Sequence, residues 1–366
     1  MSGLREGESA FGRTLEGAGW PMRGRTRRTA FGAAVVALGL VWLAAGGCGS
    51  TSWKTADGRI VTGRIDFQHE ATTGRVYHLY VPTSYNPRRA YPLVISAQGT
   101  FPFDEARNQR DRWVEVAEKN NLIICSADFD GANGLLSVPL DHPAPELVRD
   151  DKTTMAILQE LQSRYNIRKD AIMITGWSGG GLTAHFVGLR HPDTFRCIVG
   201  RAANFNDHLV TDAEALRARH MHVYCFLGTA DLPGWAEMNR SANYWYTVRG
   251  FRNFRIRQIP GGHDPNQAEA ARYFVDIISH WPSVRIESSS REGRAPLAVA
   301  LQAIIKDPDS PDGRVDTILW NLGDNTVATR PDVTHTYSKP GLYNVFLTVI
   351  DKDGNHEYAQ TWVQVD

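Results

Sequence analysis

The chain has 366 residues, which is enough for one large catalytic domain with a smaller module, or for two medium domains. Lysine and arginine together number 40, and aspartate and glutamate also number 40, so the formal net charge is zero. This balance argues against a strongly basic nucleic-acid-binding protein, and we expect no nucleic-acid partner.

The first 47 residues have the order of an export signal. Basic residues, among them Arg23 and Arg28, precede an apolar stretch at 30–45, and small residues then lead to Cys48. The apolar stretch is shorter than the ~20 residues that cross a bilayer. Charge, a short apolar span and small residues in this order are typical of a signal peptide. Cys48 resembles the lipidated cysteine of a bacterial lipoprotein, although Ala45 stands where leucine is usual.

We therefore predict export, with a lipid on Cys48 as a membrane anchor on the outer face. A plain secretory signal, giving a secreted or periplasmic protein, or an uncleaved anchor is the alternative. A start at Met22 gives a leader of more ordinary length than a start at Met1. Residues 48–73 are polar, and we interpret them as a linker and lead-in to the first domain.

Residues 74–282 alternate between apolar strands and amphipathic helices. We expect strands at 75–82, 91–97, 122–127, 171–175, 197–200, 222–227 and 254–259. Helices are expected at 110–119, 147–165, 182–189, 235–248 and 268–281. This alternation predicts a mostly parallel sheet with helices on both faces. Cys125, Cys197 and Cys225 lie within these apolar runs, and we expect them to be small core residues rather than metal ligands or a redox pair.

A nucleophile is predicted at the turn after the strand at 171–175. The run Gly176-Trp177-Ser178-Gly179-Gly180 has the pattern G-x-S-x-G, with a strand before it and a helix after it. Such a turn is too tight for side chains beside the serine, and it lifts the serine hydroxyl above the sheet edge. We predict that Ser178 is the nucleophile; a structural glycine-rich turn is the alternative.

A serine nucleophile needs a base, and the base needs a carboxylate to orient it. On this fold the chain order is serine, acid and histidine, with the last two in loops after later strands. His263 follows the strand at 254–259, and Asp231 follows the strand at 222–227. We predict that these two residues complete the triad. Asp264 is the competing acid, but because it is adjacent to His263 we expect it to cap the loop instead.

Two backbone N–H groups must stabilise the negative charge that develops on the carbonyl oxygen. Gly179, the residue after the nucleophile, is expected to supply the first. The second should come from the loop after the strand at 91–97, where Thr100 is our choice and Gly99 the next candidate.

From about Gly74 to Trp281 the chain resembles the secreted esterase branch of α/β-hydrolases, which includes polyhydroxybutyrate depolymerases and feruloyl or acetylxylan esterases. The shared features are Asp150-Asp151, Tyr165-Asn166-Ile167, the elbow with its extra Gly181, and His191-Pro192-Asp193-Thr194-Phe195. The resemblance implies hydrolysis of carboxylic esters.

Two residues depart from that pattern. Gln98 replaces the histidine that is usual before Gly99, which puts the geometry of this loop in question. Trp177 is a bulky residue beside the nucleophile and would shape the acyl pocket. For Asp150 and Asp151 we expect a structural role, the stabilisation of a helix N-terminus.

Residues 283–366 contain only short alternating strands separated by proline and glycine, which predicts a small β-sandwich. This part resembles a polycystic-kidney-disease (PKD) domain in the runs 320–325, 335–337, 340–343 and 347–349. Such domains usually act as spacers or help to present polymer surfaces. We expect Asp324 and His335 to be turn and packing residues rather than part of a site.

The sequence thus predicts a secreted serine esterase that acts through an acyl-enzyme and needs no cofactor or metal. Its ester substrate is expected in plant polysaccharides or polyesters. A serine peptidase on the same fold is one alternative, because fold does not decide chemistry; the lack of a propeller-sized N-terminal domain counts against the oligopeptidase form. A non-catalytic surface-binding protein is the other.

Overall fold

The computed structural model describes residues 54, 58, 60–134, 144–310, 312 and 314–366. The predicted signal peptide, 1–47, and the predicted lipidation site, Cys48, lie outside these residues. Within the described part, none of the helices is both long and apolar enough to cross a membrane.

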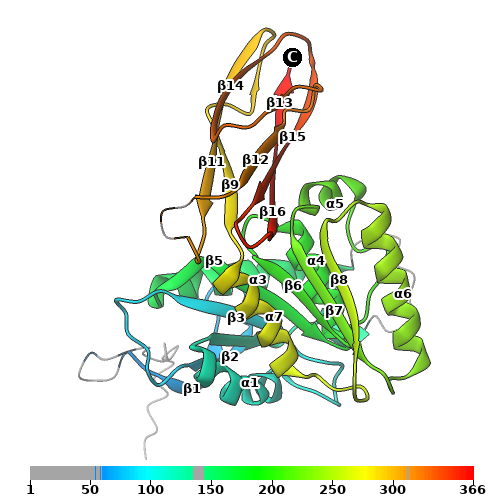
Figure 1. The fold of residues 1–366 in the computed structure, drawn as a ribbon. Helices are drawn as coiled ribbons and strands as arrows, with labels where there is room; N and C mark the ends of the chain where they lie inside the picture. The colour runs from blue at the N-terminus through cyan, green and yellow to red at the C-terminus, as the bar shows by residue number, and fades with distance from the viewer. Residues whose placement is uncertain (1–53, 55–57, 59, 135–143, 311, 313) are drawn as a thin grey trace, which may run out of the picture. The chain divides into compact units, whose positions relative to one another are not determined.

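An eight-stranded sheet forms the centre of the first domain (Figure 1). Its strand order is β1-β2-β4-β3-β5-β6-β7-β8. The strands are β1 (Gly63–His69), β2 (Val76–Val81), β3 (Tyr91–Ala97), β4 (Ile123–Ala127), β5 (Ile167–Trp177), β6 (Cys197–Arg201), β7 (His222–Gly228) and β8 (Asn253–Ile259). β1 and β2 are antiparallel to their neighbours, and the pairs from β4 through β8 are parallel. The predicted mostly parallel sheet is therefore confirmed.

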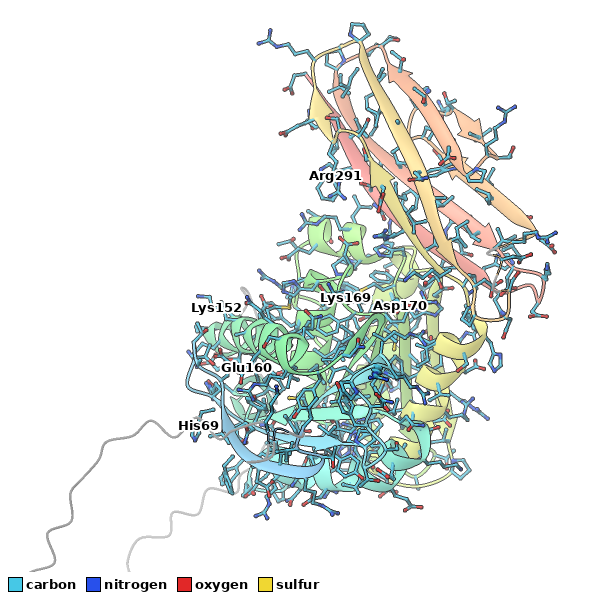
Figure 2. The ribbon with its side chains drawn as sticks, turned by 90° about the vertical axis from the view of Figure 1, so that its left-hand side faces the viewer. His69, Lys152, Glu160, Lys169, Asp170 and Arg291 are labelled. Carbon is cyan, nitrogen blue, oxygen red and sulfur yellow. The ribbon has the colours of Figure 1, made fainter. Side chains whose placement is uncertain are left out.

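Helices cover both faces of this sheet. They are α1 (Ala106–Asn120), α2 (Gly131–Gly134), α3 (Pro145–Arg164), α4 (Gly180–Arg190), α5 (Asp212–Ala218), α6 (Pro233–Val248) and α7 (Gln267–His280). α1 and α7 contact each other and pack on one face, whereas α4 and α6 pack on the other, with α3 and α5 against α4 (Figure 1). Figure 2 labels Lys152 and Glu160 on α3.

The burial of the strands explains why they read as continuous apolar runs. Every residue of β4 and of β7 is buried, as expected for parallel strands covered on both faces. Cys125 in β4, Cys197 in β6 and Cys225 in β7 are buried free thiols, so the prediction that they are core residues is confirmed. β1 lies within 48–73, the stretch interpreted as a lead-in, and adds an antiparallel edge strand to the sheet.

The C-terminal domain is a sandwich of two sheets. Their strand orders are β10-β16-β15-β12-β13 and β14-β11-β9. The strands are β9 (Ser283–Ser288), β10 (Glu292–Gly293), β11 (Leu297–Lys306), β12 (Thr317–Asn321), β13 (Val327–Ala328), β14 (Asp332–Tyr337), β15 (Gly341–Ile350) and β16 (His356–Val365). Trp320 is fully buried between the sheets, and its Nε1–H donates to the carbonyl of Arg330 at 2.8 Å. His335 pairs with Asp324 at 2.7 Å, which agrees with the structural role expected for both.

Candidate active site

Ser178 lies at the turn between β5 and α4, in the elbow that the sequence predicts. Its φ is 51°, a left-handed conformation that is strained for a residue other than glycine. Flanking glycines make the turn possible: a Cβ at Gly176 would lie 2.0 Å from the carbonyl oxygen of Gly180. The Ser178 N–H donates to the carbonyl of Arg201 at 3.2 Å, which ties the elbow to the end of β6.

Asp231 and His263 meet at the carboxyl edge of the same sheet. The Nδ1 atom of His263 lies 3.0 Å and 3.2 Å from the two carboxylate oxygens of Asp231. The Asp231 carboxylate is almost fully buried, with a side-chain exposure of 1%, against 24% for His263. Their loops are joined by a hydrogen bond from the Ala230 N–H to the Gly261 carbonyl at 2.8 Å. Asp264 donates its N–H to Gly262 inside this loop and, among the described hydrogen bonds, does not bind the imidazole.

The imidazole of His263 is packed between two indole rings. Its centroid lies 4.5 Å from that of Trp235 and 5.5 Å from that of Trp177, the residue before Ser178. The structure thus pairs His263 with Asp231 and places the imidazole against the elbow. Among the described contacts, the imidazole is not hydrogen-bonded to the Ser178 hydroxyl. In free enzymes such catalytic contacts are often long and tighten only with substrate bound.

Gly179 and Thr100 lie next to each other beside the elbow. A Cβ at Gly179 would lie 2.5 Å from Thr100 Oγ1 and 2.6 Å from the carbonyl oxygen of Ala132. In the described part of the chain, the N–H groups of Gly179 and Thr100 donate no hydrogen bond to another residue. The Gly99 N–H is used differently, because it donates to the Asp104 carboxylate at 2.8 Å. Of the two loop candidates, Thr100 therefore keeps a free donor.

Gln98, which stands where the resemblance led us to expect histidine, anchors the loop after β3. Its Nε2 donates to the Phe129 carbonyl at 2.8 Å, and its Oε1 accepts from the Phe129 N–H at 3.3 Å. The side chain is buried, and both ends of its amide are satisfied. This departure therefore joins the loop after β3 to the segment after β4 without an unpaired polar atom.

Asp150 and Asp151 do not stabilise the N-terminus of α3, the helix that carries them; Asp150 instead binds N–H groups at the start of α2. α3 begins at Pro145, so both residues lie beyond its first turn, where the helix dipole acts most strongly. Asp150 instead accepts hydrogen bonds, each 2.8 Å long, from the Asp130 and Gly131 N–H groups and from Thr183 Oγ1 on α4. Burial raises the pKa of the Asp150 carboxyl to about 6.

Asp151 faces a different partner and also has no role at the helix terminus. Its Oδ1 lies 2.6 Å from Nε2 of His191, and His191 belongs to the loop after α4. Asp150 and Asp151 therefore connect α3 to the elements around the elbow.

Arg201 is a residue of the site that the sequence reasoning missed. Its side chain is fully buried at the end of β6. It donates to the hydroxyls of Thr175 and Ser96, to Gln109 Oε1 and, at 3.1 Å, to the Pro265 carbonyl. Burial lowers its pKa to about 9. Since Pro265 follows the His263 loop, Arg201 links that loop to the strands under the elbow; an arginine ending an apolar strand was the signal in the sequence.

Exposed apolar side chains and unpaired buried donors occur on the segments that carry the candidate residues. Phe101 and Phe103, on the Thr100 loop, and Leu232, after Asp231, are exposed large hydrophobic residues. The indole N–H groups of Trp177 and Trp235 and the Thr100 hydroxyl are buried without a partner in the described part. Among the described residues there is no cluster of three or more metal-binding side chains.

The fold and the elbow define the class of protein. A mostly parallel sheet with a serine elbow between β5 and α4 is the α/β-hydrolase fold, and the C-terminal sandwich is a PKD domain. Residues 149–244 match the prolyl oligopeptidase family, and residues 286–365 match the PKD domain family.

Curated relatives match only a small part of this chain. A collagenase, ColA, of Bacillus cereus is 45% identical over 56 residues, which are 15% of this chain and 6% of that protein. A microbial collagenase of Vibrio alginolyticus is 24% identical over 88 residues, 24% of this chain and 11% of that protein. The chain thus spans about a tenth or less of these two relatives.

Solved structures resemble the two domains separately. A ferulic acid esterase of Anaeromyces mucronatus is 17% identical with a TM-score of 0.45, covering 60% of this chain and 90% of its own. A dipeptidyl peptidase 4 of Porphyromonas gingivalis is 16% identical with a TM-score of 0.44, covering 58% and 35%. The PKD1 domain of a Vibrio cholerae metalloprotease, PrtV, is 32% identical with a TM-score of 0.20, covering 23% and 96%.

Proposed function

We propose that this protein is an exported serine esterase that hydrolyses carboxylic esters through an acyl-enzyme. Ser178 Oγ attacks the ester carbonyl carbon while His263 Nε2 takes the hydroxyl proton. The alcohol leaves as the acyl–oxygen bond breaks, and the imidazolium returns the proton to it. Water, deprotonated by the same imidazole, then attacks the acyl carbon and releases the acid and free Ser178.

Asp231 and the N–H groups of the oxyanion hole have different functions in this reaction. The carboxylate of Asp231 holds the imidazole in one tautomer and stabilises the imidazolium that forms. The N–H groups of Gly179 and Thr100 stabilise the oxyanion in both steps. The pairing of His263 with Asp231 at the sheet edge that carries Ser178 is the observation that carries the proposal.

The substrate class rests on the resemblance of residues 74–281 and on the surroundings of the triad. Phe101 and Phe103, on the loop that carries Thr100, and Leu232, next to Asp231, are exposed and apolar. An ester of a plant polysaccharide or a polyester can offer apolar groups to such side chains.

The leading proposal is tested by turnover of short p-nitrophenyl esters. We expect the wild type to hydrolyse them and Ser178→Ala to lose nearly all activity. Ser163→Ala, an exposed serine on α3, is the matched control and should keep the wild-type rate. Equal ester turnover by Ser178→Ala and the wild type would rule out this nucleophile.

A serine peptidase is the second candidate, because residues 149–244 match the prolyl oligopeptidase family. Peptide p-nitroanilides, assayed with the same three proteins, separate the two. Anilide turnover that depends on Ser178 would favour the peptidase, and no turnover of either substrate would favour a non-catalytic surface-binding protein.

Export and lipid attachment form a separate part of the proposal, and they rest on the sequence of residues 1–48. We expect the wild type made in a bacterial host to partition into detergent, and Cys48→Ser to remain in the aqueous phase. Aqueous partitioning of both proteins would contradict lipid attachment at Cys48.

A further inference from the structure

A cleft of about 450 Å³ opens at the opposite edge of the sheet from the triad. Arg219 and His220 line it just before β7, and Gly250, Phe251 and Arg252 line it before β8, whereas Asp231 and His263 follow these strands. The seven residues of β7 span roughly 20 Å. The cleft is therefore distinct from the catalytic site.

The C-terminal domain supplies the other wall. Asn321, Phe346 and Tyr358 line it, and both domains belong to one compact unit, Thr51–Asp366. Beside the cleft the two domains meet through a buried carboxylate. Glu357 of the C-terminal domain lies 2.7 Å from Arg196 and 2.8 Å from His222 of the first domain. The volume of the cleft lies within the ~300–1,000 Å³ range of small-molecule sites.

Two guanidinium groups face this cleft without a carboxylate. None of the lining residues is acidic, and among the described ion pairs neither Arg219 nor Arg252 takes part. Burial and the charge of Arg252 both lower the pKa of Arg219. Two like charges that are close enough to affect each other repel. An anion bound between them would offset this repulsion.

Aromatic rings position both guanidinium groups. Arg219 lies over the ring of Phe346 at 4.9 Å, and Arg252 lies over the ring of Tyr358 at 5.1 Å. Stacking leaves the N–H groups at the edge of a guanidinium free to donate. In the described part of the chain, Arg219 Nε is buried and has no hydrogen-bond partner.

We propose that this cleft binds a ligand that carries a carboxylate on a six-membered ring. A carboxylate matches the paired N–H donors of a guanidinium, which bind it with two parallel hydrogen bonds. Phe251, Phe346 and Tyr358 make part of the cleft lining apolar, which suits a sugar or aromatic ring next to the carboxylate. Uronic acids and aromatic acids share this chemistry. The proposal does not depend on the function assigned to Ser178.

Isothermal titration calorimetry on the full chain tests this proposal, with glucuronate and benzoate as ring carboxylates and acetate and inorganic phosphate as ringless anions. We expect glucuronate or benzoate to bind, and acetate and phosphate to bind at least ~10-fold more weakly. Binding of only one of the two ring carboxylates would identify the source of the ligand and still support the site. Equal affinity for all four anions would overturn it.

Two variants, Arg219→Gln and Arg252→Gln, test whether the ligand binds in the cleft. Each should weaken binding by roughly 10-fold or more, since each removes charge-assisted hydrogen bonds. Arg291→Gln is the matched control, because Arg291, labelled in Figure 2, is an exposed arginine of the sandwich. Its guanidinium also stacks on a ring, that of Trp362, at 5.1 Å. The control variant should bind as the wild type does. Unchanged affinity in Arg219→Gln and Arg252→Gln would overturn the site, and the wild-type series tests the ligand class even if either variant fails to fold.

Discussion

Replacement of Asp150 by asparagine should change how the stability of the hydrolase domain depends on pH. The carboxyl of Asp150 has a pKa raised from 3.8 to about 6 by burial, so the folded state holds its proton more tightly than the unfolded chain does. The free energy of unfolding must then fall as the pH rises from 3.8 through about 6. At ~1.4 kcal/mol per pKa unit, the total loss is about 3 kcal/mol. About half of it falls between pH 5 and pH 8.

The assay is urea unfolding at several pH values, for the wild type and for Asp150→Asn. Asparagine cannot titrate, so the stability of the variant relative to the wild type should increase by about 1 to 2 kcal/mol from pH 5 to pH 8. At every pH the variant also lacks one acceptor for the donors that Asp150 binds. Ser163→Ala, on the same helix, should follow the wild type throughout. A stability difference between Asp150→Asn and the wild type that does not change with pH would refute the reasoning.

Asp231→Asn should lower kcat for p-nitrophenyl esters by about 10²- to 10⁴-fold, because the imidazole loses its orienting carboxylate; Asp264→Asn should retain activity, and the reverse result would exchange their roles. Gly179→Ala should lower kcat by roughly 10²- to 10³-fold with little change in KM, because its Cβ would lie 2.5 Å from Thr100 Oγ1 and would displace the N–H donors of residues 179 and 100; a wild-type kcat would show that the Cβ fits without moving either donor. Glu357→Ala should cost about 3–5 kcal/mol of stability in urea unfolding, because it leaves the charge of Arg196 buried and unpaired; a loss below 1 kcal/mol would show that water or a rearrangement compensates it.

The class of fold and the elbow could be predicted because they depend on local patterns. Apolar strands alternating with amphipathic helices require a covered parallel sheet, and the glycines around Ser178 fit only a tight turn between a strand and a helix. Asp231 and His263 were predicted from their place after successive strands, since parallel strands bring their following loops to one edge. The contact between these two residues in the structure agrees with that expectation.

The parts that were missed depend on contacts between distant residues. Asp150 was assigned to a helix end because the start of α3 was predicted two residues late, and no local pattern reveals its partners on α2 and α4. Arg201 binds groups as far away in sequence as Ser96, so its role follows only from the packed sheet. Likewise, the cleft of Arg219 and Arg252 exists only where two domains meet.

The central claim is that Ser178 is a nucleophile activated by His263. The most direct measurement is reaction with an alkyl fluorophosphonate, which forms a covalent bond to activated serines, followed by peptide mass spectrometry. We expect one adduct, on Ser178, and a rate that falls by roughly 10²-fold or more in His263→Ala. An adduct on another serine, or labelling of His263→Ala at the wild-type rate, would contradict the account.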